Sequence, residues 1–207
     1  MGFQIPRLYA IIDPTQTRKF SPVAVADILL SAGVRLIQYR GKMDTSRCQC
    51  EICSEIAGRV HQAGGIFVVN DRADLARLTG ADGVHVGQED LSVEQARRVL
   101  LAGQRVGVST HNRTQLEEAE TTSADYLAFG PIFPTGSKER PDPVVGLDRL
   151  REMRRLTRKP LVAIGGIKLD NAASVIEAGA DSVAVIHDLL AAEDIGAQAR
   201  KFLQSLG

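Results

Sequence analysis

The sequence predicts a single-domain (β/α)8 barrel, a TIM barrel, over residues 1–207. Short β-rich runs recur along the whole chain, and amphipathic helical segments lie between them. No linker, low-complexity segment or shift in composition marks a second domain, and 207 residues suit one domain. Strands that alternate with helices form a parallel sheet, and eight of them in about 200 residues fit a compact barrel.

Eight strands are expected, several of them continuously apolar, as in a sheet that is covered on both faces. In chain order they span residues 7–12, 34–39, 66–69, 83–86, 105–109, 126–129, 161–164 and 182–186. The competing fold is a doubly wound open sheet. An open sheet that binds a dinucleotide would typically carry G-x-G-x-x-G after its first strand, and "YAIIDPTQT" does not.

Helices are expected between the strands, in segments such as "SVEQARRVLLAG", "NRTQLEEAE" and "DNAASVIEAGA". Ser92 and Asp170 stand where N-caps are expected, and Gly103 and Gly179 where helices should end. One helical segment carries Cys48, Cys50 and Cys53. A metal site needs converging ligands, and no second cluster of cysteine or histidine completes a set, which favours reduced thiols.

The charge balance limits the ligands of this chain. Lys plus Arg and Asp plus Glu number 25 each, which argues against bulk binding to nucleic acid or an anionic membrane. No apolar run is long enough to span a bilayer, and the N-terminus has no signal-peptide pattern. We therefore expect a soluble, cytoplasmic protein that acts on small molecules, as a monomer or as a homo-oligomer.

Functional residues of a barrel lie at the carboxyl ends of its strands. In "IQYRGK", Gln38, Arg40 and Lys42 share one strand face after Leu36, whereas Tyr39 points to the other face. A single charge at a strand end is usually just solvated. Three polar side chains in phase indicate an anion site.

Two carboxylates follow neighbouring strands, Asp71 in "NDR" and Asp90 in "GQED". Taken singly, each could cap the helix that follows it. Together, beside cations, they suit Mg²⁺ with phosphate oxygens as further ligands. A glycosidase-like acid–base pair is the alternative, and it leaves the cations unexplained.

The loops after the sixth and seventh strands carry a second set of anion-binding candidates. In "GPIFPTGSK", Thr135, Gly136, Ser137 and Lys138 offer hydroxyl, backbone and ammonium donors, although the stretch does not match a nucleotide P-loop and could be a surface turn. The pair Gly165-Gly166 could expose backbone N–H groups to a phosphate at the start of a helix, or only form a tight turn.

The histidines carry no nucleophile or metal motif. His85 alternates with Val84 and Val86 within a strand, which favours a packed or hydrogen-bonded histidine over a ligand. His61 and His111 show no pairing pattern.

Several motifs occur together in a specific order: "QYRGK", "NDR", "GVHVGQED", "GVSTH", "AFGPIFPTGSK" and "AIGGI". In this the chain resembles the thiamine phosphate synthase family over nearly its whole length. The resemblance implies a Mg²⁺-dependent transferase on a (β/α)8 barrel. Such an enzyme joins 4-amino-2-methyl-5-hydroxymethylpyrimidine diphosphate to a thiazole phosphate in a dissociative reaction that passes through a carbocation and releases diphosphate.

The resemblance also implies roles for individual residues. The pyrimidine diphosphate would be held by Gln38, Tyr39, Arg40, Gly41, Lys42, Asn70, Ser109 and Lys138, of which Arg40, Lys42, Ser109 and Lys138 are the catalytic candidates. Asp71 and Asp90 would hold Mg²⁺. The thiazole phosphate would be held by Thr135, Gly136, Ser137, Gly166, Ile186 and His187. Many family members have Ser in place of His187. The difference matters little if the contact is through the backbone N–H, weakens thiazole phosphate binding if the Ser hydroxyl contributes, and adds an anion contact if His187 is protonated.

Three other functions remain open. A thiazole tautomerase of the same barrel family would lack the diphosphate and metal residues, all of which stand in this sequence. A barrel isomerase or aldolase would need a poised Lys, His or Glu, and none is evident. The third alternative is not an enzyme but a non-catalytic barrel that binds phosphate ligands.

Overall fold

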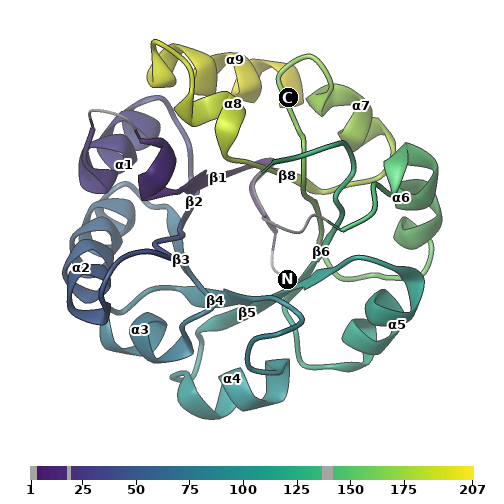
Figure 1. Cartoon of the computed structure of the whole chain (residues 1–207), viewed down its shortest axis with the longest axis horizontal. Coiled ribbons are helices and arrows are strands. Elements are labelled where there is room, and N and C mark those ends of the chain that lie inside the picture. Colours follow the sequence, from purple (N-terminus) through teal and green to yellow (C-terminus); the bar gives the residue numbers. More distant parts are fainter. Residues whose placement is uncertain (1–3, 18–19, 137–141) are drawn as a thin grey trace.

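Eight parallel strands close into a barrel in chain order, and β8 pairs with β1 (Figure 1). This computed structural model describes residues 4–17, 20–136 and 142–207. The strands are β1 (Leu8–Ile12), β2 (Leu36–Tyr39), β3 (Ile66–Asn70), β4 (Gly83–Val86), β5 (Arg105–Thr110), β6 (Tyr126–Phe129), β7 (Leu161–Ala163) and β8 (Ser182–Val185). The predicted barrel is confirmed. β4 and β6 match the expected strands at both ends, and the other strands differ by one or two residues.

The helices surround the strands as an outer ring (Figure 1). They are α1 (Pro22–Ser31), α2 (Ser46–Gln62), α3 (Ala73–Leu78), α4 (Val93–Val99), α5 (Arg113–Thr121), α6 (Gly146–Arg154), α7 (Ala172–Glu177), α8 (His187–Leu190) and α9 (Ile195–Leu206), with a 3-10 turn, η1 (Pro14–Gln16), after β1. None of the helices in the described part of the chain is long and apolar enough to cross a membrane.

Ser92 caps α4 as expected, in a capping box with Gln95. The N-cap predicted at Asp170 is wrong by one residue. The N-cap of α7 is Asn171, whose side-chain oxygen accepts from the backbone N–H of Lys168 at 2.8 Å. Gly179 follows the C-cap of α7 with φ +105°, as expected at a helix end. α4 already ends at Val99, before Gly103.

The strands separate two apolar regions. The larger one lies between strands and helices and includes Ile37 and Tyr39 of β2. The smaller one fills the barrel and consists of Tyr9, Leu36, Val68, Tyr126, Ala128, Val162 and Ala184. Gln38 faces this interior, where its amide donates to the Tyr9 hydroxyl at 2.7 Å. The alternation predicted along β2 is therefore confirmed, and it directs Gln38 into the barrel and Tyr39 away from it.

Candidate active site at the carboxyl ends of the strands

Arg40 directly follows β2 and is bound by a carboxylate from the neighbouring strand. Its backbone N–H donates to the carbonyl of Ile12 at 2.9 Å, which continues the β1–β2 ladder past Tyr39. Its guanidinium Nη1 lies 2.6 Å from Oδ2 of the buried Asp13. A guanidinium has five N–H donors, so this contact leaves donors at the mouth of the barrel for an anion.

Lys42 lies in the loop between β2 and α2, which is fixed by two side chains. Gln49 donates to the carbonyls of Gly41 at 2.8 Å and Asp44 at 2.9 Å, and the buried Tyr39 donates its hydroxyl to Asp44. A Cβ at Gly41 would come within 2.5 Å of the Tyr39 hydroxyl oxygen, so this loop path requires glycine. Tyr39 thus packs under the loop, while Lys42 stays more than half exposed above it.

Asp71 and Asp90 come together at the ends of β3 and β4. The Asp71 carboxylate lies 3.4 Å from the ammonium of Lys42. Burial raises the pKa of Asp71, the adjacent Asp90 carboxylate raises it further, and Lys42 opposes both effects. Asp71 has φ +61°, a strained value for a residue other than glycine.

The helix-cap interpretation is wrong for both carboxylates. Arg72 occupies the N-cap of α3 without a side-chain bond, and Ser92 is the N-cap of α4. Asp90 instead accepts from the backbone N–H of Gly87 at 2.7 Å.

This pair of carboxylates fits a magnesium ion. Two negative groups held close together repel each other, and a divalent cation between them would relieve that repulsion. The described residues contain no group of three or more His, Cys, Asp or Glu side chains that could hold a metal ion. An ion at this pair would therefore take its other ligands from water or from substrate phosphate oxygens, which is the usual arrangement for Mg²⁺.

A chain of hydrogen bonds crosses the barrel interior below the mouth. It starts at Gln38 and runs through Tyr9 to Tyr126, whose hydroxyl oxygens are 2.9 Å apart. The Nδ1 atom of His85 lies 3.1 Å from the Tyr126 hydroxyl, and its Nε2 atom lies 2.8 Å from the hydroxyl of Ser109. Gln38 and Ser109, both predicted substrate residues, are thus the two ends of one buried network.

The three inner members of this network are neutral near pH 7. Burial lowers the pKa of His85 to about 4, because the imidazolium would lose its hydration. Burial also raises the pKa of both tyrosines well above its usual value. The prediction that His85 is a hydrogen-bonded core residue is confirmed.

The candidate residues for the second anion lie at the ends of β6, β7 and β8. Thr135, Gly136, Gly166, Ile186 and His187 are described, and the predicted Ser137 and Lys138 lie outside the described residues. His187 begins α8, is exposed, and has its Nδ1 atom 3.2 Å from the side-chain oxygen of Gln16. Asn70 ends β3 on the other side of the mouth.

The pair Gly165-Gly166 joins two neighbouring loops. Both residues have positive φ, +87° and +66°. A Cβ at Gly165 would lie 2.4 Å from Cβ of Pro131, and one at Gly166 would lie 2.5 Å from the carbonyl oxygen of Pro134. The expected helix start does not follow the pair, because α7 begins only at Ala172. These glycines therefore let the β6 and β7 loops pack closely.

The mouth is hollowed beside the cations. A cavity of about 230 Å³ lies between η1 and the β2 loop, and it is lined by Pro14, Thr15, Gly41, Lys42, Met43 and Asp44.

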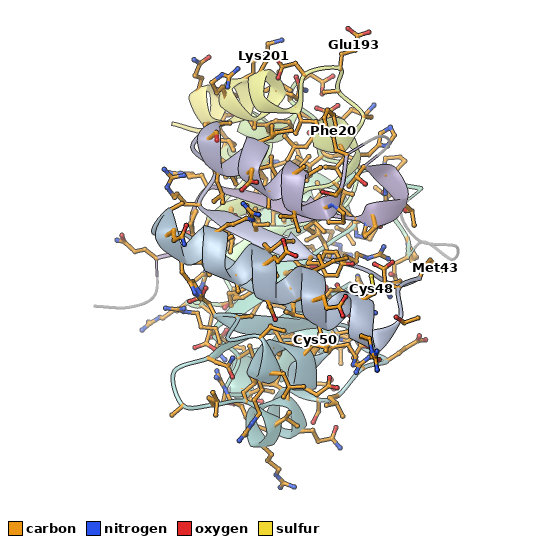
Figure 2. The ribbon with its side chains drawn as sticks, turned by 90° about the vertical axis from the view of Figure 1, so that its left-hand side faces the viewer. Phe20, Met43, Cys48, Cys50, Glu193 and Lys201 are labelled. Atoms are coloured by element: carbon orange, nitrogen blue, oxygen red, sulfur yellow. The ribbon has the colours of Figure 1, made fainter. Side chains whose placement is uncertain are left out.

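The first turns of α2 carry Cys48 and Cys50, and Met43 lies in the loop before them (Figure 2). Cys48 and Cys50 are half-buried thiols, and burial raises the pKa of Cys53 to about 12.

Three residues that hydrogen bonds link to the predicted site are not among the residues predicted from the sequence. Tyr9 and Tyr126 lie within expected strands, and a hydroxyl within an apolar strand needs a partner, which is a signal that the sequence offers. Asp13 is the third. It follows β1 directly, so the rule applied to the other strand ends would have selected it.

Comparisons with known proteins show which family and which sequences the chain is similar to. A family model described as thiamine monophosphate synthase matches residues 8–189. The thiamine-phosphate synthase of Koribacter versatilis is 51% identical over 99% of this chain and 98% of its own length. The thiamine-phosphate synthase of Chloroflexus aurantiacus is 43% identical over 94% of this chain and 90% of its own length.

Solved structures give the same picture. The thiamine phosphate pyrophosphorylase of Pyrococcus furiosus superposes with a TM-score of 0.88 at 32% identity, over 97% of this chain and 95% of its own. The 3-hexulose-6-phosphate synthase of Salmonella typhimurium superposes with a TM-score of 0.75 at 21% identity, over 97% and 98% of the two chains. At that identity the second likeness concerns the fold alone.

Proposed function

The chain belongs to the thiamine monophosphate synthase family, and from this premise we propose that it joins a pyrimidine diphosphate to a thiazole phosphate. The first substrate is 4-amino-2-methyl-5-hydroxymethylpyrimidine diphosphate, and the second is thiazole ethyl phosphate or its carboxylated form. The products are thiamine phosphate and diphosphate, and CO2 is released as well when the thiazole carries the carboxylate.

One observation carries the proposal: two cations and two carboxylates converge at the mouth of the barrel. Arg40 and Lys42 follow β2, and Asp71 and Asp90 follow β3 and β4. The cations would bind the diphosphate oxygens. Asp71 and Asp90 would hold Mg²⁺, which when bound adds positive charge to the same leaving group.

The reaction we propose is dissociative. The C–O bond between the pyrimidine methylene and the diphosphate breaks, and the diphosphate keeps the electron pair. The thiazole nitrogen then supplies its lone pair to the resulting carbocation, which forms the new C–N bond. That nitrogen has no proton to lose, so the step needs no general base. Arg40 and Lys42 would stabilise the charge that grows on the leaving oxygens.

Neutral side chains deeper in the barrel suit the pyrimidine ring. The amide of Gln38 and the hydroxyl of Ser109 are held by the interior network, and an aromatic heterocycle offers donors and acceptors to such groups. Asn70, at the end of β3, adds a further amide. Ser109 and Lys138 remain catalytic candidates on the strength of the family resemblance.

The thiazole phosphate would lie on the opposite side of the mouth. There Thr135, Gly136, Gly166 and the backbone at Ile186-His187 gather at the ends of β6, β7 and β8. Ser137 is the remaining predicted contact. Binding on opposite sides would place the two substrates in line, which lowers the entropic part of the barrier.

Direct synthesis tests the proposed function. Purified protein is mixed with the pyrimidine diphosphate, the thiazole phosphate and Mg²⁺, and thiamine phosphate is measured by fluorescence after oxidation to thiochrome. We expect product that increases with time and with protein concentration. Folded protein that forms no product would contradict the proposal, and tautomerisation of the thiazole alone would favour the tautomerase function.

The metal assignment is tested with Asp71→Ala plus Asp90→Ala. We expect product formation to fall at least about a hundredfold, because the leaving-group charge loses its metal. Asp27→Ala is the matched control, since Asp27 pairs with Arg59 on the surface between α1 and α2. Full activity in the double variant, or in wild-type protein with chelator, would remove Mg²⁺ from the site.

A further inference from the structure

Asp13 is a buried aspartate directly after β1 whose carboxylate oxygens both have partners. The residue is 3% exposed. Its Oδ1 accepts from the backbone N–H of Thr15 at 3.0 Å and from the Thr15 hydroxyl at 2.6 Å. Its Oδ2 lies 2.6 Å from Nη1 of Arg40. Asp13 therefore links η1 to the cation that follows β2.

The strand register brings this pair together. Ile12 pairs with Tyr39 in the β1–β2 ladder, and Asp13 and Arg40 are the next residues of each strand. The backbone bond from Arg40 to Ile12 extends the ladder to this position. The contact therefore follows from the register of two paired strands.

A buried carboxylate has a cost unless charge and hydrogen bonds compensate it. Here Arg40 supplies the charge and Thr15 supplies the hydrogen bonds. The Arg40 side chain is only 18% exposed, and its guanidinium lies 2.6 Å from Asp13. Lys42, the other cation of the mouth, is 55% exposed and lies 3.4 Å from its partner.

An aspartate close to a bound diphosphate would weaken the binding if it acted through its charge alone. Asp13 is therefore poorly suited to raise substrate affinity and well suited to orient a donor. We propose that Asp13, fixed by Thr15, is a positioning residue that aims the guanidinium of Arg40 at the leaving diphosphate. This inference rests on the proposed function, because it assigns Arg40 to the diphosphate.

A double-mutant cycle in thiamine phosphate synthesis tests the inference, with Asp13→Asn, Arg40→Ala and the combined variant. We expect Asp13→Asn to lower kcat about tenfold and to change KM for the pyrimidine diphosphate less than about threefold, because orientation matters most in the transition state. In the Arg40→Ala background, Asp13→Asn should have almost no further effect on kcat. Independent, multiplying effects would overturn the inference.

Two further variants separate positioning from stability. Thr15→Val removes the hydroxyl bond to Asp13 and leaves every charge in place. It should lower kcat by a smaller factor than Asp13→Asn does. In the Arg40→Ala background it should leave kcat unchanged. It also replaces Asp13→Asn if that variant fails to fold. Asp27→Asn is the control, because Asp27 lies on the surface, 3.1 Å from Arg59. The kcat of this variant should equal that of wild type. Thr15→Val with wild-type kcat would contradict the inference.

A measurement without substrate distinguishes this inference from the proposed function. The Nε–H signal of Arg40 is identified by NMR from its loss in Arg40→Lys. We expect an ordered guanidinium in wild type and a mobile one in Asp13→Asn. If wild type makes no thiamine phosphate, the proposed function fails, and the NMR result still decides whether Asp13 fixes Arg40. An Arg40 signal equally ordered in both proteins would refute the positioning role.

Discussion

At the scale of single residues, Arg40 and Lys42 carry the same charge but differ in how closely a carboxylate binds them. Arg40 is fixed by a buried carboxylate at 2.6 Å, whereas Lys42 lies exposed, 3.4 Å from Asp71. A fixed donor can be complementary to a transition state, because it needs no reorganisation when charge develops. An exposed ammonium contributes mainly charge, which solvent screens.

Arg40→Ala should therefore lower kcat as well as raise KM for the pyrimidine diphosphate. We expect a loss of about a hundredfold in kcat, the size found when one fixed oxyanion donor is removed. Steady-state thiochrome kinetics at saturating thiazole phosphate measure both constants. Arg59→Ala, on the surface of α2, is the control and should behave as wild type. A change in KM alone would make Arg40 an anchor for the ground state.

The buried imidazole of His85 should make stability depend on pH. Its pKa falls from 6.5 in the unfolded chain to about 4 in the folded protein, so the unfolded chain binds the proton more readily. This contribution is complete above pH 6.5 and is lost as the pH falls toward 4, by at most about 1.4 kcal/mol per pH unit.

Urea unfolding at pH 7.5, 6 and 5 measures this dependence. His85→Gln removes the titrating group and should flatten the decline in the free energy of unfolding below pH 6.5. The same slope in wild type and His85→Gln would show that other groups cause the decline.

At the scale of elements, the loops after β6 and β7 depend on each other. Gly165 and Gly166 adopt positive φ and leave room for Pro131 and Pro134 of the β6 loop. Among the described residues, the same two loops carry three of the predicted thiazole phosphate contacts, Thr135, Gly136 and Gly166. The shape of both loops therefore depends on close packing at Gly165 and Gly166, where any side chain would clash with the β6 loop.

Gly165→Ala should lower the free energy of unfolding and raise KM for the thiazole phosphate. The new methyl group would meet Pro131 at 2.4 Å, in addition to about 1–2 kcal/mol for a positive φ. Gly64→Ala is the matched control, because Gly64 has φ +68° and nothing within 4 Å of the added Cβ. The control should lose less stability and keep its KM. Equal KM effects would disprove a role of the β6–β7 contact in binding.

At the scale of the whole molecule, closure of the barrel makes the site. It brings Asp13 after β1, Arg40 after β2, Asp71 after β3 and His187 after β8 to the end of the barrel at which all parallel strands terminate. The chain has no net charge, so long-range attraction contributes little to substrate capture. The anion binding that we propose would therefore depend on the local arrangement of charges at the mouth.

If residues 1–207 form one domain, the chain should unfold in one cooperative transition. Scanning calorimetry should give equal calorimetric and van't Hoff enthalpies, and Mg²⁺ with inorganic diphosphate should shift the whole transition upward. Two separate transitions, of which only one responds to the ligands, would show that the chain holds two domains.

The sequence predicted more of the fold than of the site. Strand positions were recovered to within two residues, because a buried parallel strand is encoded by a short local apolar run. The phase of Gln38 and Tyr39 was recovered for the same reason. The N-cap predicted at Asp170 was not recovered, and the capping alternative for Asp71 and Asp90 is also wrong. A capping side chain can bond to several backbone groups, and only the folded backbone decides which of them it meets.

The sequence by itself determined the barrel and the membership of a family whose motifs stand in order along the chain, and it predicted the end of the barrel at which the site lies. Only the tertiary structure decided which groups touch. It joined Asp13 to Arg40, Lys42 to Asp71, and Gln38 to Ser109 through Tyr9, Tyr126 and His85. The physical reason is that apolar periodicity is a local property of the chain. Ion pairs and hydrogen bonds, in contrast, depend on strand register and barrel closure, which bring together residues far apart in the sequence.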